Sequence, residues 1–330
     1  MKLSTNYLGL KLRNPLVVGA SPFGDNLNAA IQLQDAGAAA IVMRSLFEEQ
    51  IDLEQKALTY LLEMPAESYA EATTYFPHYE EYQLTPDHYL RQLQQLKSAL
   101  TIPVIASLNG FRPGGWTDYA RRFADAGADA IELNLYHLVT DPDLSAGEVE
   151  ADMFETVRSV TSTVKIPVAV KISGFHSAPV RFALALEKAG AAGVVVFNRF
   201  YQPDLDIEEL EAKPQLKLSD SSELLLRLRW LAIMSPHVSG SLAATGGVHN
   251  AEDVIKSILA GAHAVQLVSV LLKNGPRYLA TILQGLKAWM DEHGYETVNE
   301  FRGAMNLKRC PDASAFERAN YQRILQSWKI

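Results

Sequence analysis

Eight short apolar runs recur along the chain, and segments of a different periodicity separate most of them. In the separating segments apolar residues recur at spacings of three and four, as in HYLRQLQQLKSAL, PVRFALALEKAG and AEDVIKSILAG, which is typical of amphipathic helices. The runs are largely apolar throughout and predict strands that are buried on both faces. They cover residues 16–20, 39–43, 103–108, 130–135, 167–172, 193–197, 241–244 and 264–268.

A four-residue phrase precedes four of these runs, with at most one residue in between. It reads DAGA at 35–38 and 125–128, KAGA at 188–191 and LAGA at 259–262. Its glycine is suited to the left-handed conformation that ends a helix, and its small alanines let the next strand begin close to the helix. The phrase therefore predicts a helix-to-strand joint that is used four times.

Eight buried strands alternating with helices predict a parallel sheet closed into a (β/α)8 barrel, which belongs to the α/β class. A doubly wound open sheet is the alternative. We expect one barrel over residues 1–300, including an insertion at about 47–87 after the second strand. Residues 301–330 form a C-terminal tail that packs on the barrel or extends from it.

Composition narrows the function classes. The formal charge is −8 and no cluster of Lys and Arg interleaved with aromatic residues occurs, so nucleic acid is not expected as a partner. Cys310 is the only cysteine, which excludes an internal disulfide and fits a reducing cytoplasm. No apolar stretch reaches the roughly 20 residues that span a bilayer, and the histidines lack metal-ligand spacing. We expect a cytoplasmic protein that neither associates with a membrane nor binds a metal.

Polar residues follow every apolar run, at the strand ends where barrel enzymes carry their chemistry. Any one of them is also explained as a cap or a solvated residue, but together they predict an amide-rich, cationic pocket suited to a flat heteroaromatic ring that carries an anion. They are Ser21, Arg44, Ser45, Asn109, Asn134, Tyr136, His137, Lys171, Ser173, Asn198, Arg199, Thr245, Gly246, Gly247 and Ser269.

The last two strands end in a pattern typical of phosphate binding. Thr245, Gly246 and Gly247 follow the seventh strand and Ser269 follows the eighth, where many barrels bind phosphate through backbone N–H groups. The alternative is a plain tight turn before a helix capped by Asn250.

Several of these motifs resemble one family. They are YLGLKLRNPL at 7–16, ELNL at 132–135, VKI at 170–172, Asn198, and TGG at 245–247. Over roughly residues 4–300 the chain resembles the class 1-like, FMN-dependent dihydroorotate dehydrogenases, (β/α)8 flavoproteins of pyrimidine biosynthesis that open with a hairpin. Asn198 resembles the family's sixth-strand asparagine, which lies beside the flavin ring and the substrate.

The resemblance implies an FMN oxidoreductase that acts on CH–CH bonds and transfers a hydride between flavin and a dihydropyrimidine-like small-molecule substrate. A homodimer is the expected assembly. The residues expected to bind FMN are Ala20, Ser21, Arg44, Ser45, Asn109, Asn134, Lys171, Asn198, Thr245, Gly246, Gly247, Val268 and Ser269. Those expected to bind substrate are Arg44, Asn134, Asn198 and Arg199.

The chain departs from the family at its substrate side. His137 stands three residues after Asn134, where the family has its Cys or Ser base, and Arg44 replaces a lysine. The family's substrate loop is missing from the Tyr-rich segment after the second strand. We therefore expect dihydroorotate oxidation to be slower than in the family. His137 or Tyr136, with Lys171, is the expected catalytic group; an imidazole with a pKa near 6.5 suits proton transfer at neutral pH. A loop histidine bonded to a carbonyl, or a water as proton carrier, is the alternative.

Two other functions remain open at this point. One is an FMN-binding protein with lost or altered turnover, which the missing base and substrate loop would allow. The other is a flavin-free barrel lyase or aldolase in which Lys171 forms a Schiff base.

Overall fold

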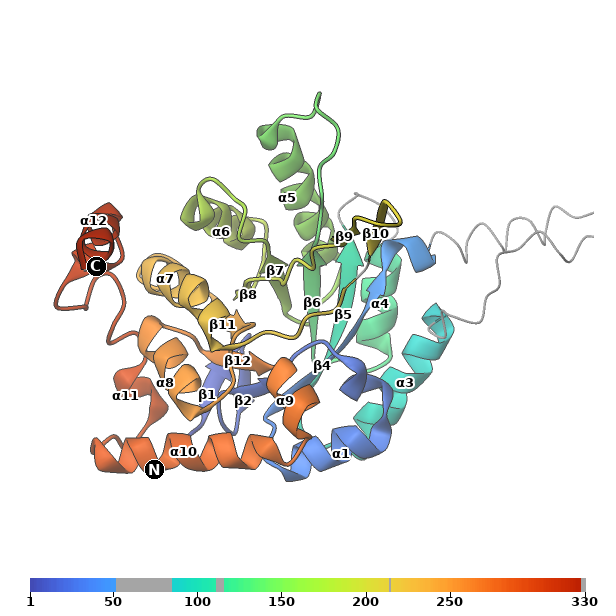
Figure 1. Cartoon of the computed structure of the whole chain (residues 1–330). Coiled ribbons are helices and arrows are strands. Elements are labelled where there is room, and N and C mark those ends of the chain that lie inside the picture. Colours follow the sequence, from blue (N-terminus) through green and yellow to red (C-terminus); the bar gives the residue numbers. More distant parts are fainter. Residues whose placement is uncertain (52–84, 111–115, 214, 328–330) are drawn as a thin grey trace, which may run out of the picture.

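The computed structural model contains one closed, parallel, eight-stranded barrel (Figure 1). The structure describes residues 1–51, 85–110, 116–213 and 215–327. All eight predicted strands are present, and the (β/α)8 barrel is confirmed. The strands pair in the order β11-β12-β3-β4-β5-β6-β7-β8. Their bounds are β3 (Leu16–Val18), β4 (Ala40–Phe47), β5 (Val104–Gly110), β6 (Ala130–Leu135), β7 (Val168–Ile172), β8 (Gly193–Val196), β11 (Ser241–Thr245) and β12 (Ala264–Leu267).

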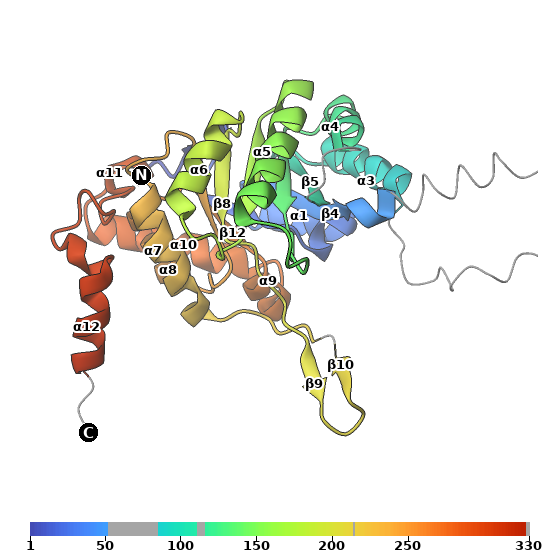
Figure 2. The ribbon, with the colours of Figure 1, turned by 90° about the horizontal axis from the view of Figure 1, so that it is seen from above.

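Helices surround this barrel (Figures 1 and 2). Their caps follow from sequence, as at Asn250, whose side chain accepts a hydrogen bond from the Asp253 amide at the start of α8. The surrounding helices are α1 (Leu27–Asp35), α3 (Pro86–Ala99), α4 (Trp116–Asp125), α5 (Ala146–Thr163), α6 (Pro179–Lys188), α7 (Leu224–Met234), α8 (Ala251–Ala260), α9 (Ser269–Asn274) and α10 (Tyr278–Glu292). Short 3-10 helices η1 (Pro22–Asp25) and η3 (Ser221–Glu223) precede α1 and α7.

The repeated four-residue phrase is the joint that the sequence predicts. Its four glycines, Gly37, Gly127, Gly190 and Gly261, have φ values of +112°, +93°, +99° and +123°. A residue with a Cβ is strained in this region, whereas glycine is not. The four joints thus return the chain from a helix to the next strand with the same local geometry.

Alternate residues of each strand face opposite sides of the barrel wall. Outward-facing residues pack against the helices, and inward-facing small residues such as Ala130 and Ala169 fill the interior. A hairpin of β1 (Thr5–Tyr7) and β2 (Leu10–Leu12) contributes to this inner cluster through Tyr7, Leu8 and Leu12. The expected N-terminal hairpin is confirmed, and its apolar side chains pack into the amino end of the barrel.

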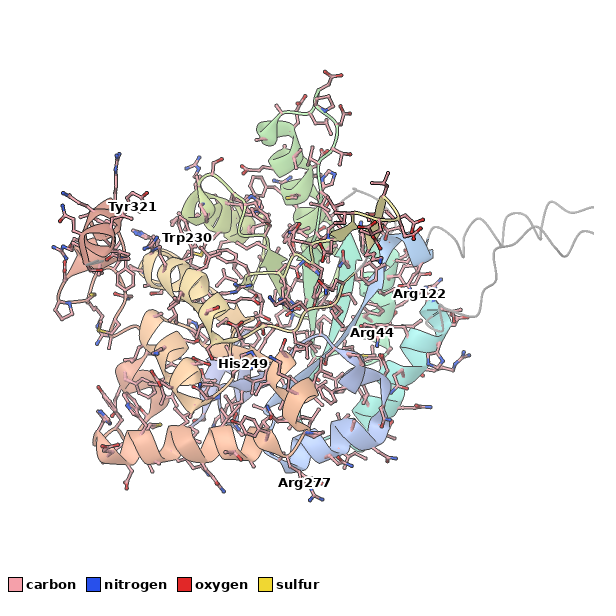
Figure 3. The ribbon with its side chains drawn as sticks, in the orientation of Figure 1. Arg44, Arg122, Trp230, His249, Arg277 and Tyr321 are labelled. Atoms are coloured by element: carbon pink, nitrogen blue, oxygen red, sulfur yellow. The ribbon has the colours of Figure 1, made fainter. Side chains whose placement is uncertain are left out.

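Three further segments lie outside the barrel proper. The β9 (Asp204–Asp206) and β10 (Glu211–Lys213) hairpin projects from it, as does α12 (Arg318–Ser327), which carries Tyr321 (Figures 2 and 3). Before α12, α11 (Val298–Phe301) packs on the barrel, and η4 (Ala313–Ala315) follows. Most of the insertion expected at about 47–87 lies outside the described residues, so the domain division stays a prediction.

Candidate active site

The polar floor of the site follows from the same alternation that fills the barrel. Ser107, Glu132, Lys171, Thr245 and Gln266 each lie two residues beyond an inward-facing apolar residue of the same strand. A step of two residues along a strand returns to the same face. The inward positions therefore change from small apolar residues to polar ones toward the carboxyl ends of the strands.

A cavity of about 420 Å³ opens at this carboxyl end. Its lining includes residues from all eight strands or the turns directly after them, and Arg44 and His249 lie in this part of the molecule (Figure 3). Twelve of the thirteen residues expected to bind FMN, together with Arg199 and Tyr136, are lining residues. The full lining is Ala20, Arg44, Ser45, Phe47, Asn109, Asn134, Tyr136, Lys171, Phe197, Asn198, Arg199, Tyr201, Ser219, Thr245, Gly246, Gly247, Val248, Gln266, Val268 and Ser269.

Three expected site residues do not line the cavity. Ser173 follows β7, and its hydroxyl accepts a hydrogen bond from the Phe175 amide at 3.0 Å. Ser21 is buried just after β3, and its hydroxyl has no hydrogen-bond partner among the described residues. His137 is half-buried next to Tyr136, which does line the cavity. The structure thus brings Tyr136, and not His137, to the wall of the cavity in this state.

Lys171 is held by a buried carboxylate. Its ammonium lies 2.8 Å from Glu132 Oε1, and the Glu132 side chain is only 1% exposed. The amide nitrogen of Gln266, on β12, donates to the other oxygen of the same carboxylate at 2.5 Å. Lys171 and Gln266 line the cavity, while Glu132 lies behind them. The ammonium's charge is compensated within the barrel.

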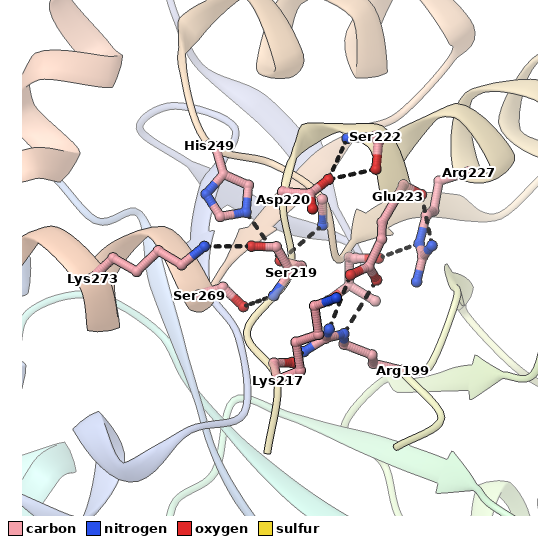
Figure 4. Close-up of polar contacts among 12 residues, drawn as sticks. Arg199, Lys217, Ser219, Asp220, Ser222, Glu223, Arg227, His249, Ser269 and Lys273 are labelled. Carbon is pink, nitrogen blue, oxygen red and sulfur yellow. Dashed lines mark hydrogen bonds and ion pairs between the residues drawn. The ribbon is translucent and has the colours of Figure 1, made fainter. Parts of the chain in front are cut away.

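The two strand-end arginines also have carboxylate partners. Arg44 pairs with Asp25 of η1 at 2.7 Å, and burial raises the pKa of Asp25 although the Arg44 charge opposes that shift. Arg199 holds both oxygens of Glu223, at 2.9 and 3.2 Å (Figure 4). Its guanidinium also lies over the Tyr201 ring. Paired guanidinium groups are fixed in direction, and each keeps further N–H donors for a ligand.

The turn after β11 is suited to binding an anion through its main chain. Gly246 and Gly247 have φ values of +84° and +81°, and a Cβ on Gly247 would lie 2.4 Å from the Leu224 amide nitrogen. Arg227 supports the turn from behind, because its Nε donates to the Thr245 carbonyl at 3.1 Å. Burial lowers the pKa of Arg227. Both glycines are required by conformation, and Gly247 also by space.

Ser219 belongs to the segment before η3 and contacts this turn (Figure 4). Its hydroxyl accepts a hydrogen bond from the Gly247 amide at 3.4 Å and lies 3.0 Å from His249 Nε2. Its amide donates to the Ser269 hydroxyl, and its carbonyl accepts from the Lys273 ammonium. Burial, and then the Lys273 charge, lowers the pKa of His249. This end of the cavity therefore combines backbone donors, two hydroxyls and a nearby ammonium.

Aromatic rings stand behind the opposite wall. Tyr136 stacks on Phe200 with ring centroids 4.4 Å apart, and Phe175 meets Phe200 edge-on at 4.9 Å. Burial raises the pKa of the Tyr136 phenol. At neutral pH Tyr136 is thus a neutral hydroxyl that donates or accepts a hydrogen bond at the cavity wall.

The residues present fit an anionic, hydrogen-bonding cofactor such as FMN. Among the described residues, the lining contains Arg44, Lys171 and Arg199 but no Asp or Glu. Three buried lining atoms, the acceptors Asn134 Oδ1 and Gln266 Oε1 and the donor Arg44 Nε, have no partner within the described chain. Buried polar atoms are ordinarily hydrogen-bonded, so these acceptors indicate a ligand that donates N–H or O–H groups. The glycine turn supplies the complementary donors for a phosphate.

Sequence reasoning missed four groups that shape this site. Gln266 and Ser219 line the cavity, and Glu132 and Glu223 hold two of the three cations that line it. Glu132 had a detectable signal, because a carboxylate in the apolar run 130–135 requires a partner. Ser219 and Glu223 had none, since they come from a connection between strands that only the fold brings over the cavity.

The fold and site define a (β/α)8 barrel enzyme with a cation-lined cavity and a phosphate-type glycine turn. Residues 84–290, well over half of the chain, match the family described as dihydroorotate dehydrogenase. The chain belongs to the dihydroorotate dehydrogenase family, whose members are flavin-dependent oxidoreductases that act on CH–CH bonds and bind FMN.

Several relatives with similarity over nearly the whole chain are named the catalytic subunit of dihydroorotate dehydrogenase B (NAD(+)). The relative in Thermoplasma volcanium is 28% identical over 91% of this chain and 97% of its own length. The one in Methanothermobacter thermautotrophicus is 25% identical over the same two shares, 91% and 97%. A relative in Bacillus mycoides is 27% identical over 94% of this chain and 98% of its own length.

Two features are absent from the part of the chain that the structure describes. No helix in residues 1–51, 85–110, 116–213 or 215–327 is both long and apolar enough to cross a membrane. Within the same part of the chain, no group of three or more His, Cys, Asp or Glu side chains is arranged to hold a metal ion.

Proposed function

We propose that this protein is an FMN-dependent oxidoreductase that transfers a hydride between the flavin and a dihydropyrimidine-like small molecule. The observation that carries the proposal is the cavity lined by three cations and no carboxylate among the described residues, with the glycine turn at its edge. When bound, FMN supplies the two-electron chemistry. The protein's own residues bind and orient the reactants and move the accompanying proton.

The roles of the lining residues follow from their chemistry. Gly246, Gly247 and Ser269 would hold the phosphate through N–H and O–H donors. Lys171 would contact the ring from the cavity floor, with Ala20, Ser45, Asn109, Thr245 and Val268 around it. Arg44, Asn134, Asn198 and Arg199 would bind the substrate.

A proton must leave or reach the substrate carbon next to the one that exchanges the hydride. His137 occupies the sequence position of the family's base, whereas Tyr136 lines the cavity beside it. In this proposal His137 exchanges the proton, and the Tyr136 hydroxyl takes that role if His137 does not reach the substrate. The two residues are adjacent in sequence, so a rearrangement of this one segment would exchange their positions.

The lyase or aldolase alternative is disfavoured by the Glu132 ion pair. A Schiff base requires an amine that is free to attack a carbonyl, but the Lys171 nitrogen is held in an ion pair 2.8 Å from Glu132. An FMN-binding protein with altered turnover remains the second candidate, because His137 does not line the cavity.

The test begins with release and identification of the cofactor from the purified protein. Flavin reduction is then measured with dihydroorotate, dihydrouracil and related rings, and reoxidation with fumarate, NAD and quinone. Lys171→Ala should give largely colourless protein or a flavin with impaired reduction. Full flavin occupancy with unchanged reduction in that variant would contradict the role of Lys171. A flavin that photoreduction reduces but none of these rings does would favour the second candidate.

The proposal also includes a cytoplasmic location and a homodimer. One cysteine in 330 residues fits a compartment in which thiols stay reduced. Sedimentation velocity of the purified protein tests the assembly, with a monomer as the contrary result.

A further inference from the structure

Glu132 is a charged residue inside the barrel that does not itself line the cavity. Its side chain is 1% exposed, and both of its carboxylate oxygens are used, one by Lys171 on β7 and one by Gln266 on β12. Glu132 lies on β6, so these contacts join strands from different parts of the barrel wall. The carboxylate thus fixes two cavity-lining side chains at once.

The surroundings of Glu132 make its charge effective. Tyr7, from the N-terminal hairpin, is completely buried in the inner cluster. Burial raises the pKa of Tyr7 well above its ordinary value, and the Glu132 charge raises it further. Charges interact strongly where water is excluded. The negative charge of Glu132 is therefore felt through the barrel interior, including by Lys171 at the cavity floor.

Removing one member of such a pair has a predictable electrostatic result. Without Glu132 the Lys171 ammonium would be buried with an uncompensated charge, a state that proteins tolerate poorly. The positive potential at the cavity floor would increase. A group bound above the floor would then be stabilised more strongly in whichever of its states carries more negative charge.

We propose that Glu132 is a positioning residue that directs the Lys171 ammonium and the Gln266 amide toward the bound cofactor and partly neutralises the charge that the cofactor experiences. The inference rests on the proposed function, because it takes the occupant of the cavity to be FMN. Glu132 acts through Lys171 and Gln266 and touches neither cofactor nor substrate.

The direct test is the midpoint potential of FMN bound to Glu132→Gln, which keeps the side-chain shape and removes the charge. The reduced cofactor should be favoured over the oxidised one by at least tenfold relative to the wild type. For a two-electron couple this corresponds to a potential about 30 mV more positive. An unchanged potential in a folded, FMN-loaded variant would overturn the inference.

Asp253 offers a matched control. It is also a buried carboxylate, 4% exposed, and it accepts hydrogen bonds from Ser221 and from the His249 amide, away from Lys171. Asp253→Asn makes the same chemical change and should leave the potential unaltered. An equal shift in both variants would mean that loss of any buried carboxylate has this effect, which would also overturn the specific role of Glu132.

A second pair of variants covers the case in which Glu132→Gln does not fold. Lys171→Met leaves Glu132 unpaired, and the double variant Lys171→Met/Glu132→Gln has no buried charge at this position. In FMN-free protein the double variant should melt at a higher temperature than Lys171→Met. A double variant that melts at or below the temperature of Lys171→Met would show that the pair is not coupled and would overturn the inference. Because this measurement needs no flavin, it separates the inference from the proposed function, which fails if the wild type binds no FMN.

Discussion

The two sides of the cavity differ in what they are made of. The side at β11 and β12 consists largely of main chain, where Gly246 and Gly247 adopt conformations that other residues avoid. The side at β6 and β8 consists of side chains, and its polar groups include Asn134, Tyr136, Asn198 and Arg199. Main-chain donors bind any phosphate-bearing group in the same way, whereas side chains decide which molecule reacts. We therefore expect the side at β11 and β12, the cofactor side, to bind FMN as in the family, and the side at β6 and β8, the substrate side, to recognise the substrate with residues of its own.

The largest effect that would test this difference is expected at His137. His137→Ala should slow flavin reduction by substrate by roughly 10² to 10⁴, the usual contribution of a general acid or base, without loss of bound FMN. In the oxidising direction the wild-type rate should rise with pH through one ionisation between about pH 5.5 and 8, because the neutral imidazole is required. For a reductase the sign reverses. Stopped-flow measurements over this pH range provide the check.

Tyr136→Phe and Asn134→Ala are the companion variants. Burial raises the pKa of Tyr136, so a phenol acting as the proton donor would keep the rate flat through neutral pH and lose it only in strong alkali. Wild-type kinetics and an unchanged pH profile in His137→Ala would transfer the role to Tyr136 or to water. Asn134→Ala should weaken binding while the ionisation persists.

The next effect concerns substrate affinity at Arg199. Arg199→Gln removes a charged donor, so the Kd of the substrate found by screening should rise roughly 10- to 100-fold, with FMN affinity nearly unchanged. The substrate Kd of Arg199→Lys should lie between those of the wild type and Arg199→Gln, because an ammonium keeps the charge but lacks the planar fork of a guanidinium. Arg158→Gln, on the exposed face of α5 where Arg158 pairs with Glu155, is the control. An equal loss of affinity for FMN and for substrate would contradict the distinction between the two sides of the cavity.

The cofactor side is tested by Gly247→Ala. The new Cβ would lie 2.4 Å from the Leu224 nitrogen at a φ of +81°, so FMN affinity should fall at least about tenfold through strain and a displaced turn. Gly275→Ala is a matched control, since Gly275 has the same φ of +81° and nothing within 4 Å of the added Cβ. Fluorescence titration of FMN measures both. Equal weakening would mean that strain alone, and not this turn, is responsible.

The smallest effect is a loss of stability in acid that we attribute to His263, the residue directly before β12. Burial, and then the Arg302 charge, lowers the pKa of His263 to about 4, and its Nδ1 accepts a hydrogen bond from the Leu242 amide. The folded protein thus holds this imidazole neutral, while the unfolded chain protonates it below about pH 6.5. Stability from this group is complete above pH 6.5 and decreases as pH falls toward 4. About 2 kcal/mol should be lost by pH 5.

Thermal melts of the wild type and His263→Asn at pH 7.5 and 5 measure this loss, with exposed His293→Asn as the control. The asparagine oxygen replaces the acceptor but does not titrate, so that variant should show a smaller change between the two pH values. If FMN is released over the same temperature range in which the protein unfolds, FMN binding depends on the integrity of β12. An identical pH response in all three proteins would exclude His263 as the cause.

The fold was largely predictable because its signals are local. Apolar runs, helical spacings and the repeated glycine joints depend on neighbouring residues, and all eight strands occur where these patterns predict them. Much of the cofactor side was predictable for the same reason, since Lys171, Thr245, Gly246 and Gly247 stand at strand ends and resemble family motifs. The substrate side was less accessible, because its loops depart from those motifs.

The sequence by itself therefore determined the barrel, the order of its strands and the polar character of one end. Only the tertiary structure decided which of Tyr136 and His137 lines the cavity, that Ser219 lines it, and that Glu223 pairs with Arg199 at its wall. It also brought Glu132 between Lys171 and Gln266, which are 39 and 134 residues away along the chain. Closure of the barrel creates such contacts, and no periodicity within one strand or helix encodes a partner that far away.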